Sequence, residues 1–143
     1  MKRYQFRLEA VLRVRRIEEE SAGADLAAAS KALQLAEAEI DRRLDHYRAI
    51  ATPDGPVPHE QFLAQRARCD HAAAAVVLAG AARSPAEAEV HRARDRWAAA
   101  TMRVRALERL DERRRGEHDA EVRRDEIVTL DEVFAARLVR GAP

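Results

Sequence analysis

The feature that most constrains the fold is a repeat of apolar residues every three or four positions in the second half of the chain. One series carries mainly large side chains at seven-residue intervals and is interrupted only by Arg83; it consists of Phe62, Cys69, Val76, Val90, Trp97 and Val104. The second series consists of Ala72, Ala79, Ala86, Ala93, Ala100 and Leu107. A 3.5-residue repeat held for about six heptads is typical of a coiled coil. The helix that it predicts needs a second helix to pack against.

The first part of the chain supplies a matching repeat. It consists of Ala22, Leu26, Ala29, Leu33, Ala36 and Ile40, and it continues after one extra residue with Leu44, Tyr47 and Ala51, while Tyr4, Leu8 and Val11 provide its start. Three prolines and a glycine fall within residues 52–58 and cannot lie inside a helix. The sequence therefore predicts one all-α module: a helix over 4–51, a turn over 52–58 and a helix over 59–139, paired as an antiparallel coiled-coil hairpin.

The second helix contains one awkward dipeptide, Ser84-Pro85, which usually opens a new helix. The heptad phase nevertheless passes through it without a skip. We therefore expect a continuous helix with a kink near residues 81–85, and a separate third helix is the alternative.

The position of the turn predicts which residues face each other. A turn centred near residue 55 places Leu8 opposite Met102 and Tyr4 near Ala106. Residues 111–140 then extend beyond the first helix as an unpaired helical arm. An apolar stripe on this arm, formed by Ile127, Leu130, Phe134 and Leu138, is typical of a docking face.

Composition argues against several other functions. Charged residues make up 36% of the chain and aromatic residues 4%, and the net charge is only +1, which disfavours nucleic-acid binding. No apolar run is long enough to enter a bilayer as a span. The five histidines show no metal-ligand spacing, and no catalytic or cofactor-binding motif is present. We therefore expect no enzyme activity, cofactor or metal. The single Cys69 fits a reducing compartment.

The two ends of the chain carry a family resemblance. Residues 6–15, with the pattern F-x-L-x-x-V-L-x-x-R, resemble the opening of the flagellar export protein FliJ family. The basic and acidic stretch over 107–114, the Arg-Arg-Asp-Glu of 123–126 and the Asp-Glu of 131–132 are similar to that family's C-terminal helix. The resemblance implies an antiparallel coiled coil like the central stalk subunit of rotary ATPases.

The resemblance also implies partners and contact residues. Family members insert the end that bears both termini into the ring of the flagellar export ATPase, promote its assembly and activity, and contact the cytoplasmic domain of the export gate and export chaperones. By this resemblance the ATPase-facing candidates are Arg7, Leu8, Val11, Arg13, Arg109, Arg113, Asp131, Glu132 and Phe134. The gate-facing candidates are Gln61 and Phe62, and the seam candidates are Leu26, Leu33, Ile40, Tyr47, Phe62, Cys69, Val76, Val90, Trp97 and Val104.

We accordingly expect a monomeric cytoplasmic protein at the cytoplasmic face of the membrane export apparatus. The alternative is a structural or oligomeric coiled-coil spacer, or the stalk protein of a related virulence-type secretion system.

Overall fold

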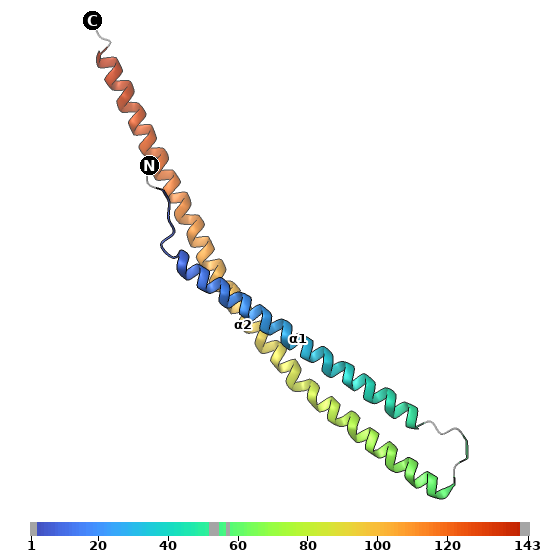
Figure 1. Cartoon of the computed structure of the whole chain (residues 1–143). Coiled ribbons are helices and arrows are strands. Elements are labelled where there is room, and N and C mark those ends of the chain that lie inside the picture. Colours follow the sequence, from blue (N-terminus) through green and yellow to red (C-terminus); the bar gives the residue numbers. More distant parts are fainter. Residues whose placement is uncertain (1–2, 52–54, 57, 141–143) are drawn as a thin grey trace. The chain divides into compact units, whose positions relative to one another are not determined.

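Two long helices make up nearly all of the protein in the computed structural model, which describes residues 3–51, 55–56 and 58–140, with side chains up to residue 137. Helix α1 runs over Glu9–Ala51 and helix α2 over His59–Arg140 (Figure 1). No strand occurs among these residues, so the predicted all-α helical hairpin is confirmed. Most of the predicted turn, and the side chain of Leu138, lie outside the described residues.

The helix contacts divide the chain into two units. Unit 1 consists of residues 1–18 and 100–143, and unit 2 consists of residues 19–99. Each unit contains a part of both helices.

Within unit 2, the segments of α1 and α2 run side by side in opposite directions (Figure 1). Its core consists of Ala29, Val90 and Ala93, with Leu26 and Leu33 packed against them. Ala93 has no exposed surface at all. Alanine on both helices lets the backbones approach closely, so leucine and valine side chains complete a narrow seam.

Other predicted seam positions of unit 2 differ in how far they are covered. Ile40, Tyr47, Cys69 and Val76 are half-buried. Phe62 keeps 50% of its surface exposed and Trp97 keeps 42%. The indole of Trp97 lies beside Gly23, where an added Cβ atom would be 3.5 Å from its Nε1 atom.

The predicted register is wrong: the residue numbers of facing pairs have a sum that is five to ten higher than expected. The Gln65 side-chain amide donates a hydrogen bond to the backbone oxygen of Ile50, and Arg83 pairs with Glu37 at 3.4 Å. The residue numbers of these two facing pairs add up to 115 and 120, whereas the predicted pairs add up to about 110. On this register the residues that would face Phe62 lie beyond the end of α1 at Ala51, and the hairpin centres near residues 58–60 rather than 55.

Helix α2 continues through Pro85 without a break, as the uninterrupted heptad phase predicted. A proline inside a helix removes one backbone hydrogen bond and costs about 3 kcal/mol or more. Ion pairs support the helix across the proline and after it. Arg83 bonds to Glu87 at 2.9 Å, and Glu89 accepts hydrogen bonds from Arg92 and Arg96.

Surface carboxylates in unit 2 are held ionised by such pairs. Hydrogen bonds from Arg96 and Arg92 lower the pKa of Glu89, and hydrogen bonds from Arg42 and Arg43 do the same for the pKa of Glu39. Exposed pairs of this kind contribute little individually. Their role is to favour the helical conformation along a chain with a thin core.

Candidate protein-interaction surface

The N-terminal segment before α1 packs along α2 within unit 1. Phe6, Leu12 and Val104 form a buried cluster, and Leu107 and Leu110 pack against it. The backbone N–H of Glu9 donates to the carbonyl of Phe6 at 3.2 Å, which marks the first turn of α1. A carboxylate there suits the positive end of the helix dipole.

This segment corrects the sequence prediction of a helix from residue 4. Helix α1 begins at Glu9, so helical spacing cannot be applied to residues 4–8. Leu8 and Val11, which were expected to continue the seam, keep 37% and 43% of their surfaces exposed. Phe6 and Leu12 are buried instead, because an extended segment followed by a helix turns different side chains toward α2.

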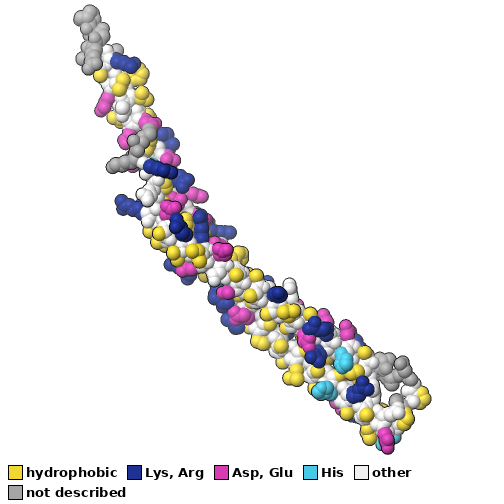
Figure 2. Space-filling view, in the orientation of Figure 1, with side chains coloured by type: hydrophobic (Ala, Val, Ile, Leu, Met, Phe, Trp, Pro, Cys, Tyr) yellow, Lys and Arg dark blue, Asp and Glu magenta, His cyan; other side chains and the backbone are white. Residues whose placement is uncertain are grey.

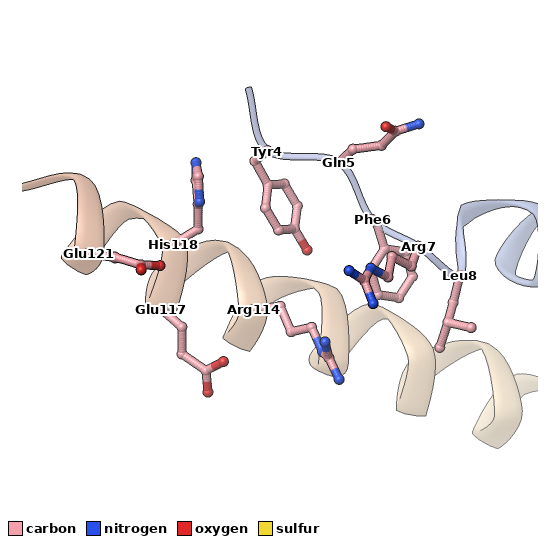
Figure 3. A pocket seen from close by; sticks show the side chains of 9 residues that line it. All are labelled: Tyr4, Gln5, Phe6, Arg7, Leu8, Arg114, Glu117, His118 and Glu121. Carbon is pink, nitrogen blue, oxygen red and sulfur yellow. The ribbon is translucent and has the colours of Figure 1, made fainter. Parts of the chain in front are cut away.

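Tyr4 connects the N-terminal segment to α2 through polar and aromatic contacts. Its hydroxyl donates a 2.7 Å hydrogen bond to Oδ1 of Asp111. Its ring lies 5.6 Å from the ring of His118, and the Arg115 guanidinium lies 5.6 Å from the ring centroid. Figure 3 shows the ring pointing toward α2 while Gln5 points away. Partial desolvation and the hydrogen bond to Asp111 raise the pKa of Tyr4, so the phenol stays a donor.

A second polar contact in unit 1 joins α1 directly to α2. Arg16 forms a 2.8 Å ion pair with Glu108. The Tyr4–Asp111 and Arg16–Glu108 contacts replace the predicted facing of Tyr4 with Ala106 and of Leu8 with Met102, whose surface is 72% exposed. The N-terminal segment thus covers α2 as far as His118, about ten residues beyond the predicted limit.

The C-terminal part of α2 presents apolar side chains to solvent. From residue 123 to 137 every described side chain is exposed. Between 45% and 60% of the surface remains uncovered on a group of five large residues: Ile127, Val128, Leu130, Val133 and Phe134. We call these five residues the apolar arm patch. Val128 and Val133 were missed because they lie beside, not on, the heptad stripe.

The predicted contact residues fall into both units. The ATPase-facing candidates all belong to unit 1 and all are exposed: Arg7, Leu8, Val11, Arg13, Arg109, Arg113, Asp131, Glu132 and Phe134. The gate-facing candidates Gln61 and Phe62 belong to unit 2 and are exposed on the first turn of α2. Their placement leaves every one of these side chains accessible to a partner.

The grooves beside the N-terminal segment are open rather than enclosed. The groove shown in Figure 3 is lined by Tyr4, Phe6, Leu8, Arg114 and His118, among others. Within the described parts of the chain, no three metal-ligating side chains gather into a possible ion site. The surface is thus suited to another macromolecule, since it offers extended apolar and charged area instead of a closed cavity.

A helical hairpin with an uncovered apolar arm and many exposed charges defines a class of proteins that act through contacts with other proteins. The family comparison narrows the class. The chain matches the family model described as flagellar FliJ protein over residues 4–143, and it belongs to that family. A comparison with curated proteins gives no match, and neither does a comparison with solved structures.

Membership in this family makes the protein a component of the flagellar export apparatus. It favours the flagellar apparatus over a virulence-type secretion system. In the part of the chain that the structure describes, neither helix is apolar enough over a sufficient length to cross a membrane.

Proposed function

We propose that this protein inserts unit 1 into the ring of the flagellar export ATPase and thereby promotes assembly and activity of the ring. The observation that carries the proposal is the apolar arm patch, whose five large side chains have no cover within the described chain. Exposed apolar residues concentrated on one helical segment favour docking into a complementary surface. Membership in the FliJ family, a component of the flagellar export apparatus, supports the choice of the export ATPase as the partner.

The N-terminal segment supports this role by its position in unit 1. Arg7, Leu8, Val11 and Arg13 are exposed where the segment and the start of α1 pack on α2. A partner that contacts the arm can therefore meet these residues on the same unit. Ordered contacts such as Tyr4–Asp111 lower the entropic cost of presenting them.

A truncation and a pair of matched double variants test the proposal. Removing residues 123–143 deletes the apolar arm patch but leaves the Tyr4–Asp111 contact, and it should abolish stimulation of the purified export ATPase. Leu130→Ser with Phe134→Ser should reduce the stimulation strongly. Val77→Ser with Leu78→Ser, at residues of unit 2 that are 72% and 73% exposed, is the control and should stimulate normally. Full stimulation by the truncated protein would refute the docking role of the arm.

The start of α2 is proposed to contact the cytoplasmic domain of the export gate, so that the protein links gate and ATPase at the cytoplasmic face of the membrane. Phe62 is half exposed on the first turn of α2, beside the exposed Gln61. Phe62→Ala should weaken binding to the purified gate domain while ATPase stimulation stays unchanged. Unaltered gate binding would count against this contact. Export chaperones are further proposed partners.

A second candidate function is self-association as a structural spacer. Val77 and Leu78 are the most exposed large aliphatic side chains of unit 2 and could pair between copies. Light scattering distinguishes the two functions, because the export role predicts a monomer. A dimer that becomes monomeric in the Leu78→Asp variant would favour the spacer.

A further inference from the structure

Positive charge is concentrated in one part of unit 1. Residues 3–16 contain five arginines and one carboxylate, and residues 100–116 contain six arginines and three carboxylates. Together these two segments carry a net charge of +7, although the whole chain carries only +1. We call the eleven arginines of these two segments the basic belt. The remainder of the chain is correspondingly acidic.

Most arginines of the basic belt have no carboxylate partner among the residues that the structure describes. Arg15 pairs with Glu18, Arg16 with Glu108, and Arg115 with Asp111. The other eight form no ion pair in the described part of the chain. By contrast, six of the ten lysines and arginines of unit 2 form ion pairs, including those around Glu39 and Glu89. The charge of the basic belt is thus available to a partner.

One row of the belt is unfavourable for the free helix. Arg105, Arg109 and Arg113 follow each other at spacings of four residues and are all exposed. Like charges at this spacing repel each other by a few tenths of a kcal/mol per pair. No ion pair among the described residues offsets this repulsion, so the row suits a partner that supplies carboxylates.

The belt extends around the molecule instead of forming one flat face. At about 100° per residue, Arg103 and Arg114 lie on one flank of α2, roughly 140° away from Arg109. The N-terminal segment covers the face of α2 that lies between this flank and Arg105. The segment has exposed arginines of its own, including Arg7. Figure 2 shows Lys and Arg side chains on both edges of this part of unit 1.

We propose that the basic belt is received by an encircling protein surface lined with aspartate and glutamate side chains. This inference rests on the proposed function, with the export ATPase ring as the encircling partner. A flat anionic bilayer could meet only one side of such a belt. Nucleic acid is disfavoured because neither aromatic ring of the described belt segments is free to stack on a base: Phe6 is buried, and Tyr4 contacts Asp111, His118 and Arg115. A ring can contact the belt on all sides.

The test is the rate of association with the purified, assembled export ATPase at several salt concentrations. The variant Arg105→Gln, Arg109→Gln, Arg113→Gln removes three belt charges. The control Lys31→Gln, Arg66→Gln, Arg94→Gln removes three exposed, unpaired charges from unit 2. At about 50 mM salt the belt variant should associate roughly tenfold more slowly than the wild type, because steering charges act mainly on the association rate. The difference should shrink at about 500 mM, where screening is strong. The control should associate like the wild type.

Three other outcomes would contradict the inference, and each contradicts a different part of it. If the wild type and both triple variants associate at the same rate, the basic belt is not a binding surface, and the proposed ATPase function stands. If the wild type does not bind the ATPase, both the proposed function and this inference fail. If the belt arginines instead govern tighter binding to phosphatidylglycerol vesicles or to duplex DNA, the acidic-protein assignment is wrong. Far-UV circular dichroism verifies that each variant keeps its helix content.

Discussion

Replacing Phe6 with alanine removes the largest side chain of the buried cluster in unit 1. Phe6 is 8% exposed and packs with Leu12 and Val104. A phenylalanine buries on the order of 200 Å², which at about 25 cal/mol per Å² corresponds to roughly 5 kcal/mol. The residual structure of the unfolded chain lowers this by about 10–40%. We therefore expect Phe6→Ala to destabilise the packing of the N-terminal segment on α2 by about 3 kcal/mol.

The loss should be local, because Phe6 belongs to unit 1 and the core of unit 2 consists of other residues. Amide hydrogen exchange measures it best. Every 1.4 kcal/mol is a factor of ten in an equilibrium constant, so exchange at residues 9–16 should accelerate about a hundredfold. Exchange at residues 26–33 should stay unchanged. Leu8→Ala, at a neighbouring residue that is 37% exposed, is the matched control and should cost clearly less.

Equal exchange rates in Phe6→Ala and Leu8→Ala would refute the reasoning, because they would show that the phenyl ring is not buried against α2. A uniform acceleration through both units would refute the locality of the effect. It would mean that the two units unfold together.

Three further predictions follow from the seam, the glycines and the paired carboxylates. Val90→Ala should lower the free energy of unfolding by about 1–2 kcal/mol in urea titrations, whereas Leu78→Ala, at 73% exposure, should change it by less than about 0.5 kcal/mol. Gly116→Ala should raise the melting temperature because its surroundings are open and alanine favours the helix by about 1 kcal/mol, while Gly55→Ala should lower it because φ is +103°. Because two arginines lower the pKa of Glu89, its stabilising charge is fully present above its ordinary pKa of about 4.5 and is lost as pH falls through the lowered value. Glu89→Gln should therefore flatten the acid dependence of the melting temperature below about pH 4.5, and an unchanged dependence would contradict the pairing.

The seam of α2 could be predicted from the sequence because a heptad repeat reports directly on helix packing. Val90 and Ala93 carry that pattern, and both are buried. The continuity of α2 through Pro85 could be predicted for the same reason, since a break would have shifted the phase. Periodicity is informative wherever the chain is already helical.

The N-terminal contacts and the register could not be predicted in this way. Residues 3–8 precede the helix, so the burial of Phe6 depends on how an extended segment crosses α2 and not on helical spacing. The register depends on how many residues of the interhelical turn and of the start of α2 precede the first contact between the two helices. The contact between Gln65 and Ile50 shows where it begins, and the prolines of the turn gave no measure of that length.

The alanine-rich seam has a thermodynamic consequence. Of the eight buried residues found in the described chain, four are alanines, and no large side chain is fully buried. Unfolding such a seam exposes little additional apolar surface, so the accompanying heat-capacity increment and the denaturant m-value should both be small for a chain of this length. The stability curve should consequently be flat, and unfolding should spread over a wide temperature range instead of occurring at a sharp midpoint.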